Sequence, residues 1–138
     1  MRRDRTKLLR NRESGDETYM LRRAAMAWVY RAKRAADAVG FALPRVTVRV
    51  TENATDGTLG VARMSKSIIW ITEETARGVS NRLGHVVLHE IGHAVLGLSH
   101  NPACPLMRAE VGTDVDVEAS LSAFIAACKK KIEENACN

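Results

Sequence analysis

Apolar residues recur every three or four positions between residues 16 and 39, which predicts a long amphipathic helix. The positions that share this spacing are Leu21, Ala24, Ala25, Trp28, Ala32, Ala35 and Val39. Ser14 and Glu17 have the spacing of a capping box, so we expect the helix to begin near Asp16. Gly40 is expected to end it, because glycine readily adopts the left-handed conformation that closes many helices.

The period of the pattern changes to two after Pro44, where valines alternate with threonines and an arginine. This alternation predicts a half-buried strand over residues 46–51. The polar stretch 52–58 contains Asp-Gly and is typical of a turn or loop. Two further short strands are predicted over residues 59–64 and 67–72, joined by a tight turn.

Two more helices are predicted in the C-terminal half. Residues 81–96 are apolar on nearly every side, which is typical of a buried helix, and Pro102 and Pro105 prevent its continuation. A second amphipathic helix follows, with Asp114 or Asp116 as its N-cap. Its apolar positions are Val117, Leu121, Phe124, Cys128 and Ile132. The order helix, strands, helix, helix predicts an α+β domain with antiparallel character.

The composition indicates a single globular domain. The chain has 138 residues, of which 46% are hydrophobic and 27% are charged. No apolar run has the length of a membrane span, and no apolar segment follows the arginine-rich N-terminus as in a secretory signal. Three cysteines without a C-x-x-C pair favour a reducing compartment, so a cytoplasmic location is expected.

Positive charge is concentrated at the N-terminus. Residues 1–34 carry eleven basic and four acidic side chains, a net charge of +7, whereas residues 35–138 carry ten and twelve, a net of −2. We expect residues 1–15 to form a disordered basic arm and residues 16–138 to form the domain. Such an arm can make weak contact with nucleic acid or an anionic surface.

All four histidines fall within sixteen residues, and His89 and His93 belong to an H-E-x-x-H sequence. Positions i and i+4 share one face of a helix, so both imidazoles can reach the same metal ion. Glu90 lies beside them and is too short to be a ligand, but it can reach a water bound to zinc. Zinc lowers the pKa of such a water to about 7, so Glu90 is predicted to act as general base and then as general acid.

The predicted third ligand is His100. On a continued helix it would lie roughly 10 Å beyond His93, too far to share the ion. A turn at Gly97 would reverse the chain and bring the His100 ring back toward the metal. His85, one helical turn before His89, is expected to support the site by packing.

The segment from His89 to Met107 resembles the zinc signature of metzincin metallopeptidases. In that family H-E-x-x-H is followed by x-x-G-x-x-H, and a methionine then lies in a tight turn beneath the metal. This chain has Gly97-x-x-His100, and Met107 stands where the Met-turn methionine is expected. It carries one extra residue between His93 and Gly97, which a π-bulge or a longer turn must absorb.

The resemblance implies a fold and an activity. The fold would be zincin-like, with a long backing helix, a small twisted mixed sheet, an active-site helix and a C-terminal helix. The activity would be zinc-dependent endopeptidase cleavage by a monomer that holds one catalytic zinc ion. The protein or peptide substrate would add alongside an edge strand by main-chain hydrogen bonds, at the residues Leu59, Gly60, Val61 and Ala62.

Two alternatives remain open at this stage. The first is a peptidase of the repressor-cleaving type, in which an acidic residue replaces His100 as a ligand. The acidic candidates are Glu110, Asp114, Asp116 and Glu118. The second is a non-catalytic binding or virion protein with a structural zinc site, which would need a fourth ligand such as His85 or Cys104.

Overall fold

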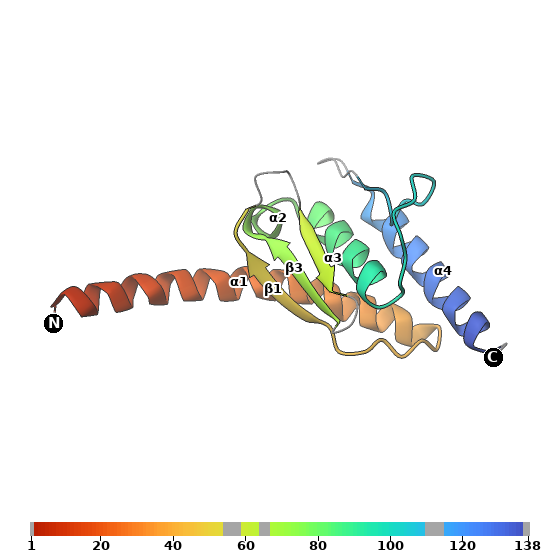
Figure 1. Ribbon diagram of the computed structural model, residues 1–138, viewed down its shortest axis with the longest axis horizontal. Coiled ribbons are helices and arrows are strands. Elements are labelled where there is room, and N and C mark those ends of the chain that lie inside the picture. Colours follow the sequence, from red (N-terminus) through yellow and green to blue (C-terminus); the bar gives the residue numbers. More distant parts are fainter. Residues whose placement is uncertain (1, 54–58, 64–66, 110–114, 137–138) are drawn as a thin grey trace.

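The computed structural model describes residues 2–53, 59–63, 67–109 and 115–136. Within these residues the chain forms four helices and a three-stranded mixed sheet, which confirms the predicted α+β class (Figure 1). The elements in chain order are α1 (Arg2–Ala38), β1 (Thr47–Thr51), β2 (Gly60–Arg63), β3 (Ile68–Thr72), α2 (Glu73–Arg77), α3 (Ser80–Ala94) and α4 (Val117–Ala136). Among the described helices, none is both long and apolar enough to cross a membrane.

Helix α1 is longer than the sequence pattern predicts. It begins at Arg2 rather than near Asp16, so residues 2–15 are helical where a disordered arm is expected. The five arginines and two leucines there, with one lysine and one glutamate, all favour the helix and outweigh one unfavourable glycine. The N-terminal part of α1 extends well beyond the sheet (Figure 1).

The C-terminus of α1 is closed as predicted. Gly40 has φ +83°, the left-handed conformation of a C′ residue. The amide of Phe41 donates to the carbonyl of Ala36 at 2.9 Å, and the amide of Gly40 donates to that of Asp37 at 3.0 Å. These two bonds are those of a Schellman motif, which turns the chain back toward β1.

The sheet has the strand order β1-β3-β2, so the third strand in sequence lies in the centre. β1 pairs with β3 in parallel, with Val48 opposite Ile69. β2 pairs with β3 in antiparallel fashion, with Gly60 opposite Ile71 and Ala62 opposite Ile69. β2 is therefore an edge strand whose outer hydrogen-bonding groups face away from the sheet.

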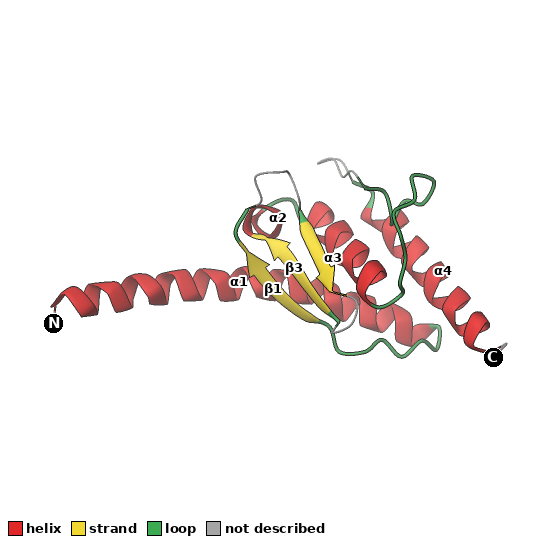
Figure 2. Ribbon diagram, in the orientation of Figure 1, coloured by secondary structure: helices red, strands yellow, loops and turns green. Residues whose placement is uncertain are grey.

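Helices cover one face of the sheet, as the ribbon coloured by secondary structure makes visible (Figure 2). Val48, Ile69 and Ile71 point to that face and are completely buried. The other face carries Val61, which is half exposed, and the partly buried Trp70. Because the described helices cover only one face, this part of the chain has a sheet layer and a helix layer, with the core between the sheet and helices α1 and α3; α4 packs against these two helices.

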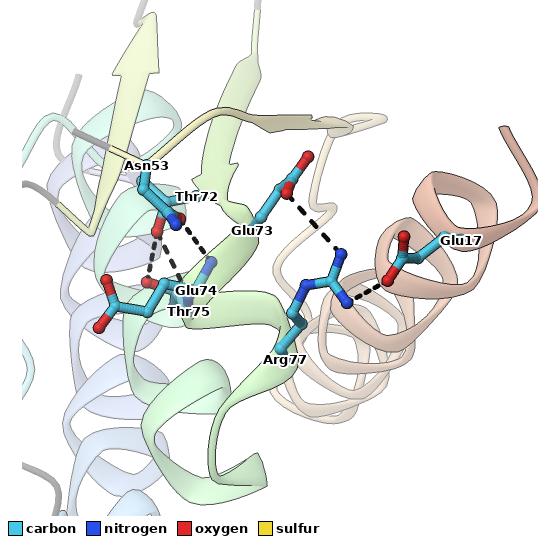
Figure 3. Close-up of polar contacts among 7 residues, drawn as sticks. All are labelled: Glu17, Asn53, Thr72, Glu73, Glu74, Thr75 and Arg77. Carbon is cyan, nitrogen blue, oxygen red and sulfur yellow. Dashed lines mark hydrogen bonds and ion pairs between the residues drawn. The ribbon is translucent and has the colours of Figure 1, made fainter. Parts of the chain in front are cut away.

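A network of polar contacts fixes α2 and the start of β2 (Figure 3). Thr72 is the N-cap of α2, and its Oγ1 accepts from the amide of Thr75 at 3.3 Å. The Thr75 hydroxyl donates to the carbonyl of Leu59 at 3.1 Å, and the amide of Thr72 donates to the same oxygen. Asn53 adds a side-chain acceptor for the amide of Glu74 at 2.7 Å. These hydrogen bonds connect the residue before β2 to the end of β3 and the first turn of α2.

Arg77 links α2 to α1 in the same region. Figure 3 shows its guanidinium between Glu17, to which it donates a hydrogen bond, and Glu73. That bond lowers the pKa of the Glu17 carboxyl. The three side chains are 41–52% exposed, so these ion pairs add little to the stability of the fold.

Helices α1 and α3 pack closely where Gly84 faces Trp28. A Cβ atom at Gly84 would lie 2.6 Å from two atoms of the indole ring, which is closer than any van der Waals contact allows. Trp28 is only 8% exposed and belongs to the main core cluster. The glycine is therefore needed for close packing of α3, which carries the histidines, against α1.

We predict that Gly84→Ala destabilises the protein by about 1–3 kcal/mol, the usual cost of overpacking a core. Denaturant unfolding followed by far-UV circular dichroism measures this difference. In a Trp28→Phe background the smaller ring leaves room for the methyl group, so there the same substitution should cost less. An equal cost in both backgrounds would show that the clash with Trp28 is not the cause.

Candidate metal centre

Three histidines meet at the C-terminal end of α3. One ligand nitrogen of each of His89, His93 and His100 lies within 4.8 Å of those of the other two. The Nε2 atom of His89 is 3.1 Å from that of His93 and 3.2 Å from that of His100. His89 is buried, His93 half-buried and His100 exposed, so the cluster opens to solvent on one side. The structure thus brings together all three predicted ligands.

Backbone carbonyls orient two of the three rings. Nδ1 of His89 is 2.8 Å from the carbonyl oxygen of Leu106, and Nδ1 of His93 is 2.6 Å from that of Leu98. A carbonyl oxygen can only accept, so each Nδ1 carries a proton. In the neutral ring Nε2 then has a free lone pair. Burial, together with the neighbouring histidines, lowers the pKa of His89 to about 4, which keeps this ring neutral at pH 7.

When both rings are neutral, with the proton on Nδ1, the two Nε2 lone pairs face each other and cannot form a hydrogen bond. Two such atoms at 3.1 Å repel unless a cation lies between them. Four-coordinate zinc with Zn–N bonds of about 2.0–2.1 Å would hold its ligand nitrogens about 3.3 Å apart. The spacing and the tautomers of these histidines therefore fit a tetrahedral metal ion.

The turn after α3 delivers His100 and absorbs the extra residue. Helix α3 ends at Ala94, and Gly97 has φ +66°. The amide of Leu98 donates to the carbonyl of Gly92 at 3.0 Å, six residues back. In a Schellman motif the corresponding bond spans five residues, so this turn is one residue wider. Of the two ways to absorb the extra residue, the structure has the longer turn.

Met107 lies directly against α3 at Gly92, the residue before His93. Its side chain is 2% exposed, and a Cβ atom at Gly92 would be 3.0 Å from its sulfur. Gly92 thus opens the space in α3 that the thioether occupies. The amide of Met107 donates to the carbonyl of Cys104 at 3.1 Å, and its own carbonyl accepts from Asn101 at 2.8 Å. The methionine is held in a tight turn, and the preceding Leu106 supplies the carbonyl for His89.

Glu90 lies on α3 between the histidine cluster and the edge strand. Its side chain is 4% exposed, and burial raises the pKa of its carboxyl to about 7. A Cβ atom at Gly60 would be 3.1 Å from Cγ of Glu90 and 3.0 Å from the carbonyl oxygen of Trp70. The missing side chain at Gly60 therefore allows the carboxylate-bearing side chain of Glu90 to lie against β2.

The residues Leu59, Gly60, Val61 and Ala62 occupy the predicted edge. Gly60 and Ala62 face α3, whereas Val61 points to the open face and is 51% exposed. The edge strand and Glu90 are thus in contact. The side chain of Arg63 lies outside the described residues.

A hollow of about 380 Å³ lies beside His100. It is lined by Leu98, His100, Cys104, Met107 and Ala127 among others, so α4 contributes to its wall. Cys104 is half-buried here, and it does not belong to the group of residues that could share a metal ion.

The other candidate ligands have different partners. Nδ1 of His85 is 2.6 Å from the hydroxyl of Ser120, which connects α3 to α4. Asp116 caps α4 by accepting from the amide of Ala119 at 3.1 Å, as predicted. Glu118 forms an ion pair with Arg31 at 2.8 Å. Glu110 and Asp114 lie outside the described residues.

Sequence reasoning did not find four contributors to the site. The carbonyls of Leu98 and Leu106 leave no signal, because every residue has a carbonyl. Ser120 is one of two serines on α4, and its role depends on how α3 and α4 meet. Gly92 could have been noticed, since a glycine inside a helix lowers helix stability and is kept there for a packing reason.

Comparison of the chain with protein-family models, with curated proteins and with solved structures finds no significant match. The site is therefore interpreted from its own geometry.

Proposed function

We propose that this chain is a zinc-dependent endopeptidase of the metzincin type. The observation that carries the proposal is the convergence of three histidine nitrogens, two of them fixed as lone-pair donors by backbone carbonyls. Within the described residues, no fourth histidine, cysteine or carboxylate joins this group. A three-ligand set that leaves one position open is typical of catalytic zinc, whereas structural zinc sites have four protein ligands.

The proposed chemistry is hydrolysis of a peptide bond. Zinc, when bound, supplies a Lewis acid that polarises the scissile carbonyl and activates a water as nucleophile. The carboxylate of Glu90 takes one proton from the attacking water, whose oxygen forms the new bond to the carbonyl carbon. The same carboxyl then delivers that proton to the leaving nitrogen as the carbon–nitrogen bond breaks. The position of Glu90 next to His89 and against β2 supports this role.

The open edge of β2 is suited to bind a substrate in extended conformation. An extended peptide could add to β2 as a further strand and form main-chain hydrogen bonds with Gly60 and Ala62, because the alternating Leu59 and Val61 direct their peptide groups to β3. Because Gly60 contacts Glu90, a peptide on this edge runs past the carboxyl and the histidine cluster. The hollow beside His100 would receive a side chain on one side of the scissile bond.

The alternative metal site, in which an acidic residue replaces His100 as the third ligand, has less support than the three-histidine site. The carboxylates of Asp116 and Glu118 are engaged in capping α4 and in pairing with Arg31. His100, in contrast, has its Nε2 atom 3.2 Å from that of His89.

We predict that His100→Ala loses both zinc and peptide cleavage, whereas Glu118→Ala keeps both. His100 is exposed and at the end of a turn, so its loss should leave the fold intact. Zinc is measured by mass spectrometry of the purified protein, and cleavage with a mixture of peptides of defined sequence. Full zinc binding in His100→Ala would exclude this histidine as a ligand. A wild-type protein that binds zinc but cleaves no peptide would contradict the proposed activity.

A further inference from the structure

A second concave surface lies far from the histidines, between α1 and the segment that leads into β1. It has a volume of about 780 Å³. Its polar and aromatic lining comes from Tyr19, Arg22, Arg23, Tyr30, Lys33 and Arg45, and we call it the basic groove. Since β1 and β2 are the two opposite edges of the sheet, the groove and the metal centre lie on different sides of the domain.

The basic groove carries four positive charges and no carboxylate. Arg22, Arg23 and Lys33 come from one side of α1, and Arg45 faces them from the segment before β1. Ion pairs elsewhere in the described part of the chain use Arg31, Arg77 and Lys131, and none involves these four cations. Cations gathered without acidic partners repel one another and attract a polyanion.

Two tyrosines lie among these cations. Tyr19 is 60% exposed and Tyr30 is 56% exposed, which is unusual for large aromatic rings in a domain with so few of them. They stand eleven residues apart, three turns of α1, and therefore lie on the same side of the helix. Exposed aromatic rings between cations are the arrangement by which proteins hold single-stranded nucleic acid, with phosphates on the cations and bases on the rings.

We propose that the basic groove binds single-stranded nucleic acid. Phosphates would contact Arg22, Arg23, Lys33 and Arg45, and bases would stack on Tyr19 and Tyr30. A bilayer of anionic lipids is the other polyanion to consider. The hollow shape and the scarcity of exposed aliphatic side chains in the lining favour a chain that enters a groove over a flat surface. This binding is independent of whether the histidine cluster is catalytic.

The test is fluorescence anisotropy of labelled 15-nucleotide probes, oligo-dT and mixed-sequence RNA, with the full chain at several salt concentrations. Four phosphate contacts predict a slope of log K against log salt of about −2.8. Arg23→Gln with Arg45→Gln should make this slope smaller by about 1.4 and weaken binding. The control is Lys129→Gln with Lys130→Gln, which removes the same charge from exposed positions on α4 and should change neither quantity.

The tyrosines separate nucleic acid from other polyanions. Tyr19→Ala and Tyr30→Ala should each weaken binding by roughly fivefold or more, whereas the phenylalanine variants should bind like the wild type. All these side chains are exposed, so the variants should fold, and circular dichroism checks this. The proposal is overturned by a wild type that binds neither probe, or by an equal loss in the α4 control. It is also overturned if the alanine variants of both tyrosines bind the probes as tightly as the wild type. Binding to anionic phospholipid vesicles without binding to the probes would overturn it as well.

Discussion

Replacing Glu90 with glutamine is expected to reduce peptide cleavage by about 10²–10⁴-fold, the usual contribution of general acid–base catalysis. Glutamine keeps the size of the side chain but cannot take a proton from water. The replaced carboxyl is 4% exposed, and burial raises its pKa to about 7, so a neutral side chain is tolerated in its place. The measurement is kcat/KM on the best peptide found with the wild type, together with zinc content and thermal unfolding.

A matched control for this substitution is Glu118→Gln. It makes the same chemical change at an exposed carboxylate on α4 and should leave cleavage within experimental error. If Glu90→Gln retained zinc and also kept cleavage within about tenfold of the wild type, Glu90 would not be the general base. Loss of zinc in Glu90→Gln would instead show that the substitution disturbs the ligands, and this variant would then not identify the base.

Removing the metal is expected to lower the melting temperature by roughly 10–20 °C. A ligand present at about 1,000 times its dissociation constant stabilises the folded state by about 4 kcal/mol, and each kcal/mol corresponds to a few degrees in a domain of this size. Without a cation, the Nε2 lone pairs of two neutral rings at His89 and His93 would repel each other at 3.1 Å. Differential scanning calorimetry before and after a chelator, and after addition of one equivalent of zinc, measures the effect.

The control here is His100→Ala, which removes one of the three nitrogens without touching α3. Its melting temperature should respond much less to the chelator, because two histidines hold zinc more weakly than three. An unchanged melting temperature of the wild type on chelation would mean that the cluster holds no ion under these conditions. Recovery with zinc but not with magnesium would agree with nitrogen ligands, since magnesium prefers oxygen.

Much of the local structure follows from the sequence. The alternation after Pro44 predicts β1, and the apolar stripe with Gly40 predicts where α1 ends. The start of α1 could not be predicted correctly, because Ser14 and Gly15 resemble a helix start. In the structure they lie within a helix that runs from Arg2.

The pairing of the strands is harder to predict. An alternating pattern is the same for a parallel and an antiparallel neighbour, so it does not tell that β1 pairs in parallel with β3. The alternating pattern also does not show that β3 lies in the centre of the sheet and β2 at its edge. The placement of Gly60 against Glu90 depends on this order and is visible only in three dimensions.

The candidate site divides in the same way. His89 and His93 follow from the helical repeat alone, since one turn separates them. His100 depends on the shape of a turn, and the orientation of the rings depends on carbonyls that the fold brings near. The pairing of His89 with His93 can thus be predicted from the sequence. The position of His100 and the hydrogen-bond partners of the rings depend on the folded structure.

The wide turn after α3 has a consequence for pattern searches. Its hydrogen bond from Leu98 to Gly92 accommodates an inserted residue and still returns His100 to the cluster. A motif definition that demands a fixed gap between the second histidine and the glycine would reject this chain. Definitions that allow one insertion at this point, and require a glycine at the position of Gly92, would retrieve proteins that close the same triad by a different loop length.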